Sequence, residues 1–250
     1  MTLAYTAWSN LKAQESDHCV VLYYHGVTEG RVRGFTRQMQ WLKSRHAVIP
    51  LRSLVTGDWS GWKVCITFDD GLDNVRQNAL PILRELNIPA TIFAVPGNLG
   101  REPSWAIADY HPDRHEILST ADRLKEYPSD LVEIGSHTMT HSDLSALTGD
   151  ALTRELLESK QSLEKLLERE VFSLSVPFGS YNQETLRAAR EAGYRLVVTC
   201  DPVVVRPGDS PQAVGRFKVT PDDWDIEFRL KAAGDYRRRL AWQRRKVQTT

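Results

Sequence analysis

The sequence predicts an α/β fold built on a sheet of parallel strands, and two observations support this class. Short apolar runs alternate along the chain with stretches of helical periodicity. Most of these runs are almost continuously apolar, which is typical of strands buried on both faces. The expected strands are 19–24, 63–68, 90–95, 131–135, 171–176, 195–200 and 213–219. The pattern fits an open sheet and a closed barrel equally well. In either, functional residues gather at the carboxyl ends of the strands.

Helical segments are expected between these strands. Phe35, Met39 and Leu42 share one face of the first, and Pro81 interrupts the second. A stripe of leucines amid charged residues marks the third, which is the longest. Gly193 provides a stop for the fourth. The expected helices are 34–45, 72–86, 148–170 and 182–192.

Composition excludes several classes of protein. The 250 residues include 32 basic and 32 acidic side chains, so net charge gives no reason to expect nucleic acid as a partner. The hydrophobic share of 41% and the charged share of 26% are ordinary for a globular chain. Three well-separated cysteines, Cys19, Cys65 and Cys200, do not form a disulfide scaffold, and the first two are expected to be buried thiols.

One domain is expected over residues 1–230, followed by a basic tail at 231–250. This tail carries seven basic residues and one acid. We expect a solvated terminal helix there, with a surface that touches anionic lipid or a partner as the alternative. No run approaches the ~20 apolar residues of a membrane-spanning helix. The first residues show no secretory signal, so a cytoplasmic location is expected, with peripheral membrane contact possible.

Two carboxylates and two histidines follow two of the expected strands. Asp69 and Asp70 precede Gly71 at the end of the second strand, where adjacent carboxylates are costly unless something binds them. His137 and His141 follow the fourth strand, and their spacing predicts one face of a helical turn, close enough to share a metal. One carboxylate and two imidazoles suit a divalent metal with open positions. The other aspartate is then free to act as a general base.

The segments TFDDG at 67–71 and SHTMTH at 136–141 resemble the first two signature motifs of the polysaccharide deacetylases of the NodB-homology type, carbohydrate esterase family 4. The resemblance extends over about residues 18–219. It implies a distorted barrel of about seven β/α units, in agreement with the seven expected strands. It also implies that Asp69 is the general base. The implied ligands of a divalent metal, commonly zinc, are Asp70, His137 and His141.

The third motif departs from the family pattern. The family usually has Arg-x-Pro-Phe or Arg-x-Pro-Tyr, whereas Ser175 stands in the arginine's place here. Pro177 and Phe178 can still wall a substrate groove, and the Phe178 amide could donate to an oxyanion. Arg216, near the end of the last strand, is a candidate for the missing charge. The alternative is an exposed arginine with a structural role.

The general acid also differs from the usual pattern, because no histidine follows His141. The segment VLYYHGV at 21–27 resembles a circularly permuted branch of the family, which includes enzymes that partly deacetylate poly-N-acetylglucosamine. In that branch the acid histidine lies on the first strand. His25 is therefore the expected acid, with a hydrogen-bonded barrel-mouth histidine as the alternative. Trp105 and Tyr181 are expected to contact sugar, although the Trp105 segment could merely cover the rim.

The resemblance implies a metal-dependent hydrolase that removes N-acetyl groups from an amino-sugar glycan or its precursor and releases acetate. Its partner would be a carbohydrate from exopolysaccharide biosynthesis. Two alternatives stay open. One is a deformylase or amidase acting on a lipid-linked or small-molecule amide. The other is a catalytically silent glycan-binding module, which the absent motif arginine favours and the intact Asp69 and Asp70 oppose.

Overall fold

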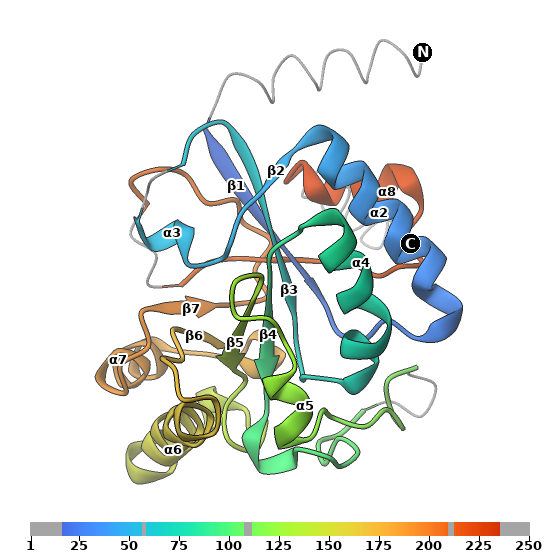
Figure 1. Cartoon of the computed structure of the whole chain (residues 1–250). Coiled ribbons are helices and arrows are strands. Elements are labelled where there is room, and N and C mark those ends of the chain that lie inside the picture. The colour runs from blue at the N-terminus through green and yellow to red at the C-terminus, as the bar shows by residue number, and fades with distance from the viewer. Residues whose placement is uncertain (1–16, 57–58, 108–111, 210–212, 236–250) are drawn as a thin grey trace, which may run out of the picture.

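A computed structural model describes residues 17–56, 59–107, 112–209 and 213–235. A curled sheet of parallel strands runs through its centre, and the helices pack around the outside (Figure 1). The strands are β1 His18–Tyr24, β2 Ala47–Val48, β3 Trp62–Phe68, β4 Ala90–Ala94, β5 Val132–Ser136, β6 Ser173–Ser175, β7 Leu196–Val198 and β8 Phe217–Lys218. Each of the seven expected runs overlaps a strand, within one residue where the strand extends past the run. The unexpected β2 is only two residues long, too short for a periodicity signal.

The spatial order of the strands is β7-β6-β5-β4-β3-β1-β8, and β2 pairs with the first half of β3. The segment that contains β8 nearly closes the curl. Val214 bridges Val198 in β7, and a few residues later Phe217 pairs with Leu22 in β1. This confirms the distorted barrel that the sequence resemblance implies. All carboxyl ends of the paired strands therefore meet at one mouth.

The helices are α2 Val32–Arg45, α3 Ser53–Thr56, α4 Leu80–Leu86, α5 Ala121–Lys125, α6 Gly149–Leu167, α7 Gln183–Glu191 and α8 Asp225–Ala232. The expected helix 72–86 is divided into a wide turn at Val75–Ala79 and α4. Pro81 lies in the first turn of α4, where a missing N–H costs no hydrogen bond. The proline therefore marks a helix start rather than a kink.

Apolar side chains fill both sides of the sheet. The larger cluster lies between sheet and helices, and a smaller one fills the barrel interior. Cys19 and Cys65 belong to the interior cluster, fully buried and with Sγ atoms 3.6 Å apart. These two cysteines are free thiols packed as small apolar groups, as expected.

Helix α8 crosses the boundary expected between residues 230 and 231. Lys231 is buried and its Nζ lies 2.6 Å from Asp223 Oδ2, so the packed structure continues into the first residues of the expected tail. The rest of that tail, 236–250, lies outside the described residues. Among the helices described, none is both long and apolar enough to cross a membrane.

Candidate active site

The turn after β3 presents the two adjacent aspartates at the barrel mouth. The Asp69 N–H donates to the Tyr24 carbonyl at 2.9 Å and so extends the β1–β3 ladder by one residue. Asp70 and Gly71 then both adopt φ 70°, a left-handed conformation that Asp tolerates and Gly adopts freely. A Cβ on Gly71 would lie 3.2 Å from the Ala94 Cα. The sharp turn buries both carboxylates, which are 3% and 4% exposed.

The loop after β5 carries the two histidines, and it is not helical. The expectation of a shared helical face is therefore wrong. His137 donates its N–H to Ala94 O at 2.8 Å, while Thr138 and His141 adopt φ values of 66° and 62°. Thr138 Oγ1 accepts the His141 N–H at 3.0 Å. Left-handed residues held by local hydrogen bonds, rather than a helical turn, aim both imidazoles at the same point.

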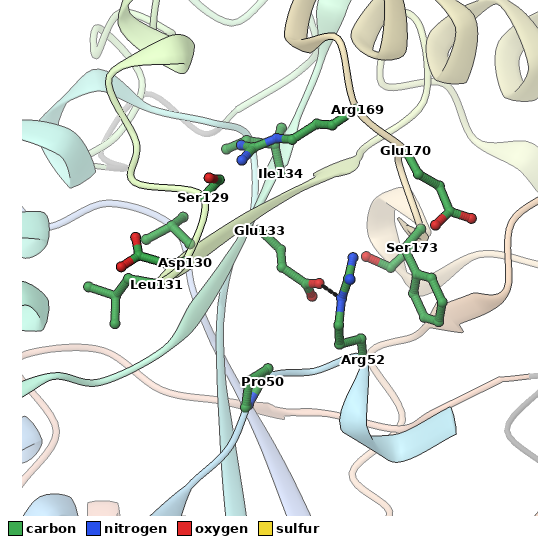
Figure 2. Close-up of a pocket in the computed structure, with 12 residues that line it drawn as sticks. Pro50, Arg52, Ser129, Asp130, Leu131, Glu133, Ile134, Arg169, Glu170 and Ser173 are labelled. Carbon is green, nitrogen blue, oxygen red and sulfur yellow. Dashed lines mark hydrogen bonds and ion pairs between the residues drawn. The ribbon is translucent and has the colours of Figure 1, made fainter. Parts of the chain in front are cut away.

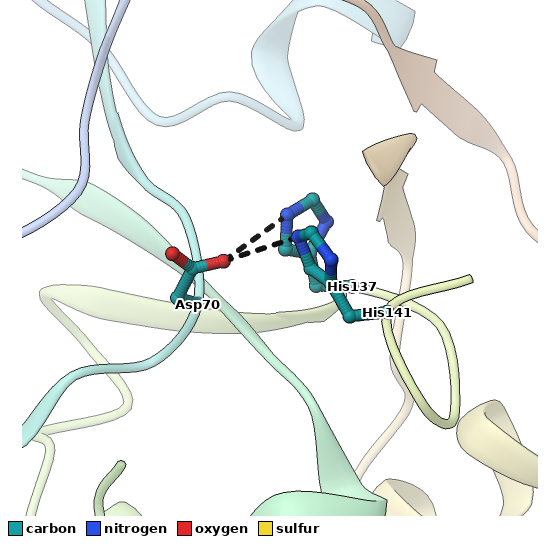
Figure 3. Close-up of side chains that lie close together, drawn as sticks. All are labelled: Asp70, His137 and His141. Atoms are coloured by element: carbon teal, nitrogen blue, oxygen red, sulfur yellow. Dashed lines mark ion pairs between the residues drawn. The ribbon is translucent and has the colours of Figure 1, made fainter. Parts of the chain in front are cut away.

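Asp70, His137 and His141 converge at the barrel mouth (Figure 3). Asp70 Oδ1 lies 3.5 Å from His137 Nε2 and 3.4 Å from His141 Nε2. Two ligand atoms of a tetrahedral zinc ion, each about 2.1 Å from it, lie about 3.4 Å apart. Asp70 Oδ1 is buried and has no hydrogen-bond partner among the described residues. The donor set and its spacing therefore fit a divalent metal.

His137 is prepared to act as a ligand through Nε2. Its Nδ1 lies 2.8 Å from the Ser175 carbonyl oxygen, which can only accept, so the ring proton is on Nδ1 and Nε2 keeps its lone pair. Burial lowers the pKa of His137 to about 4, although the nearby aspartates act in the opposite direction. The imidazole is therefore neutral near neutral pH.

Arg216 holds Asp69 by two parallel hydrogen bonds. Nη1 donates to Oδ1 at 2.8 Å and Nη2 donates to Oδ2 at 2.9 Å. The arginine is 0% exposed, which excludes the alternative of an exposed structural residue. Burial by itself would raise the pKa of Asp69. The Arg216 charge, its hydrogen bonds and the nearby histidines together outweigh that effect and hold the pKa of Asp69 well below its usual range.

All five N–H donors of the Arg216 guanidinium have acceptors. Besides Asp69, the acceptors are Thr67 Oγ1 at 3.1 Å, Ser175 Oγ at 2.8 Å and Thr199 O at 3.0 Å. The Tyr23 ring lies 4.5 Å from the guanidinium carbon. Ser175 also donates to Asp69 Oδ1 at 3.1 Å, so the residue that replaces the motif arginine supports the arginine that takes over its contact. Sequence reasoning assigned no role to Thr67 or Tyr23, although both stand in the quoted motif segments, because neither contact with Arg216 can be read from local spacing.

His25 follows β1 at the same mouth and is half-buried. Its ring centroid lies 5.9 Å from that of Tyr23. A positive charge on His25 would lower the pKa values of both Asp69 and Asp70, by less than burial raises them. The structure thus brings the expected acid to the same end of the barrel as the expected base.

The expected substrate-contacting residues divide into two groups. Phe178 is 59% exposed at φ 59°, with its ring 4.7 Å from His141, while Pro177 is buried behind it. Trp105 stacks on His141 with centroids 4.0 Å apart. Tyr181 instead donates to Asp201 Oδ2 at 3.1 Å and lines a cavity of about 330 Å³. Phe178 and Trp105 therefore flank the Asp–His–His group, and Tyr181 lines a cavity bordered by Asp201.

A second cavity, of about 290 Å³, lies near the amino ends of β5 and β6 (Figure 2). Arg52 and Glu133 form an ion pair across it. Its residues lie at the opposite ends of these strands from the histidine loop and Ser175. This cavity is therefore distinct from the mouth where the aspartates and histidines meet.

A parallel barrel with a buried Asp–His–His group beside an arginine-held carboxylate defines a hydrolase of the α/β-barrel class. The family model described as polysaccharide deacetylase matches residues 57–197, and the chain belongs to this family. The expected family is thereby confirmed.

Individual relatives agree with this assignment. The protein YxkH of Bacillus subtilis is 29% identical over 227 residues, which cover 86% of this chain and 76% of the relative. The poly-beta-1,6-N-acetyl-D-glucosamine N-deacetylase of Staphylococcus aureus is 24% identical over 204 residues, 76% of this chain and 68% of the relative. The solved structure of IcaB from Ammonifex degensii superposes with a TM-score of 0.71 at 27% identity, covering 88% of this chain and 98% of that one.

The fold also resembles that of the Streptococcus pyogenes deacetylase PplD. The two superpose with a TM-score of 0.69 at 22% identity, over 82% of this chain and 93% of the other. At this identity the likeness supports the fold alone. Together with IcaB, it places the curled parallel sheet among deacetylase structures.

Proposed function

We propose that this polysaccharide deacetylase is a metal-dependent enzyme that removes N-acetyl groups from a polymer of N-acetylglucosamine type and releases acetate. The observation that carries the proposal is that a metal-binding donor set and an ionised carboxylate lie side by side at the barrel mouth. Asp70, His137 and His141 form a donor set with metal spacing, and Asp69 is held as a carboxylate beside it. A glycan-binding module needs no ionised base next to a metal site.

The metal would be held by Asp70 Oδ1 and the two Nε2 atoms. A set of one carboxylate oxygen and two imidazole nitrogens suits zinc, and other divalent ions also bind these ligand types. When bound, such an ion would polarise the amide carbonyl and lower the pKa of water. Every other step of the proposed reaction falls to side chains and amides of this chain.

Asp69 is assigned as the general base. Because Arg216 helps to keep the pKa of Asp69 low, the carboxylate is ionised near neutral pH, and its oxygens are available to accept a proton from the attacking water. The bidentate contact with Arg216 also fixes the orientation of the Asp69 carboxylate. Ser175 and Arg216 thereby orient the base without touching substrate.

His25 is assigned as the general acid, which donates a proton to the departing amine nitrogen. The Phe178 N–H is assigned to the carbonyl oxygen as its negative charge develops. The left-handed backbone at Phe178 and the buried Pro177 before it hold that amide in the 177–179 turn. The Phe178 ring contacts His141, so the turn lies beside the proposed metal site. Acid and base thus lie on different elements, as amide hydrolysis near neutral pH requires.

The substrate class rests on the relatives. The Staphylococcus aureus relative is named for poly-beta-1,6-N-acetyl-D-glucosamine, and the fold matches that of IcaB. Trp105 and the exposed Phe178 ring would provide apolar walls for a sugar beside the metal group.

The test measures acetate release from β-1,6-linked N-acetylglucosamine oligomers by protein loaded with Zn²⁺ or Co²⁺ and by protein stripped with a chelator. We expect release only with metal. Parallel reactions contain N-formylated amino sugars and small-molecule amides. Faster hydrolysis of one of those substrates would replace the proposed substrate. Tight oligomer binding without any hydrolysis, at one bound ion per chain, would favour a silent glycan-binding module.

A further inference from the structure

The two histidines of the proposed metal site are supported in different ways. His137 donates its Nδ1–H to the Ser175 carbonyl, which fixes the ring. His141 directs Nε2 toward Asp70, but its Nδ1 is buried and has no hydrogen-bond partner among the described residues. The residue is only 6% exposed. Metal-binding histidines almost always hold their second nitrogen by a hydrogen bond, so something else must orient this ring.

Aromatic rings surround the His141 imidazole. The Trp105 indole lies parallel to it, with centroids 4.0 Å apart and an angle of 16° between the planes. Phe178 and His137 meet it edge to face, at 4.7 and 4.8 Å and at angles of 84° and 82°. A parallel ring in van der Waals contact prevents the imidazole from tilting out of its plane. The edge contacts restrict it on its other sides.

We propose that Trp105 is a positioning residue for His141, and that its stacked indole replaces the hydrogen bond that His137 has and His141 lacks. The inference rests on the proposed metal site. It also changes the part expected for Trp105, because one face of the indole is occupied by His141. Only the other face or the edge can contact sugar.

Metal binding would strengthen the stack. An imidazole that donates a lone pair to a divalent cation becomes electron-poor, and the face of an indole attracts positive charge. By linkage, a contact that is stronger in the metal-bound state raises metal affinity. Trp105 lies in the long segment between β4 and α5, so that segment and the metal site are energetically coupled through this ring pair.

The experiment compares metal affinity in wild type, Trp105→Phe, Trp105→Leu and Trp105→Ala, by competition with a chromogenic chelator for Zn²⁺. We expect Trp105→Leu and Trp105→Ala to bind ~10- to 100-fold more weakly, the usual effect of removing support from a metal ligand. Trp105→Phe keeps a stacking ring and should stay within about threefold of wild type. The absorption spectrum of the Co²⁺ form should change in the leucine and alanine variants only.

Trp62 provides a matched control, because its ring contacts that of His46, with centroids 3.8 Å apart and planes tilted by 37°, and His46 is not among the proposed ligands. Trp62→Ala should leave metal affinity unchanged even if it lowers stability. Wild-type affinity in Trp105→Leu and Trp105→Ala, with a raised KM for oligomers, would overturn the inference and leave Trp105 as a sugar contact. Absence of metal binding in wild type would instead reject the proposed function, and the inference with it.

Discussion

Arg216 and Asp69 are 147 positions apart in the chain and form a buried two-pronged ion pair, with N–O distances of 2.8 and 2.9 Å. The arginine lies between Val214, which bridges β7, and Phe217, which pairs with β1, and the aspartate directly follows β3. One contact therefore links closure of the barrel to the ionisation of the proposed base. The cost of breaking the pair should appear both in folding and in catalysis.

Arg216→Met should leave a buried, unpaired carboxylate and lower the free energy of unfolding by about 3–5 kcal/mol. Adding Asp69→Asn should recover part of this loss, because the second change removes the stranded charge. Urea unfolding of metal-free wild type, both single variants and the double variant measures the coupling. A loss in the double variant equal to the sum of the two single losses would show that the ion pair has no such role.

Moving the arginine back to its motif position tests whether Arg216 substitutes for the missing one. Ser175→Arg alone should fold poorly, because Ser175 is fully buried against the Arg216 guanidinium. Ser175→Arg combined with Arg216→Ser returns one guanidinium to Asp69. The double variant should be more stable and more active than either single variant. Additive losses in unfolding free energy and in kcat would contradict the substitution.

Acid should destabilise the metal-free protein in two stages. Burial lowers the pKa of His137 from 6.5 to about 4, so between these values the unfolded chain binds more protons than the folded one. Stability should therefore fall as the pH drops from about 6.5 to 4, by on the order of 3 kcal/mol. The Asp69 pKa is depressed, so its contribution is fully present above its usual range and is lost at lower pH. Unfolding free energies of wild type and His137→Asn across pH 3–8 should differ in slope only in the first stage. If the two plots of unfolding free energy against pH were parallel throughout, His137 would not be the group that causes the first stage.

Gly179 should be essential to the turn that carries the Phe178 amide. Its φ is 68°, and a Cβ there would lie 2.7 Å from the Cys200 Cβ. Gly61 has φ 70° with nothing within 4 Å of its Cβ position, so Gly61→Ala measures backbone strain alone. Gly179→Ala should cost about 1–3 kcal/mol more than Gly61→Ala and lower kcat sharply. Equal stability losses, with kcat unchanged in both, would show that the turn is not packed as described.

His25→Gln should separate acid catalysis from metal binding. Amide hydrolysis needs protonation of the leaving nitrogen, whereas the leaving group of an aryl ester departs as a stabilised phenolate without an acid. We expect a ~100-fold or larger fall in acetate release from N-acetylglucosamine oligomers, little change with an aryl acetate, and wild-type metal content. Kinetics with both substrates measure the ratio. A similar loss on both substrates would remove His25 as the acid.

Much of the fold could be predicted because strands buried on both faces produce nearly continuous apolar runs, and each of the seven runs overlaps a strand. The Asp–Asp–Gly turn was predictable for a local reason, since adjacent carboxylates and a glycine have few uses at the end of a buried strand. The histidine loop was not. The i, i+4 spacing suggests a helix, but Thr138 and His141 adopt left-handed conformations stabilised by hydrogen bonds within the loop.

Long-range partners were the least predictable part of the site. No local pattern connects Arg216 to an aspartate 147 residues earlier. The sequence also allowed an exposed arginine, because its burial depends on how the barrel closes. The Trp105 stack on His141 depends in the same way on a loop conformation that residue spacing does not encode. Both contacts arise from how the barrel brings separate loops to one mouth.

The most direct test of the account measures bound metal and acetate release together in Asp69→Asn and Asp70→Asn. The account predicts that Asp69→Asn keeps one divalent ion per chain and releases no acetate, because it retains the donor set and lacks the base. It predicts that Asp70→Asn loses the ion and the activity together. An Asp70→Asn protein that binds the ion with wild-type affinity, or an Asp69→Asn protein that releases acetate at the wild-type rate, would contradict it.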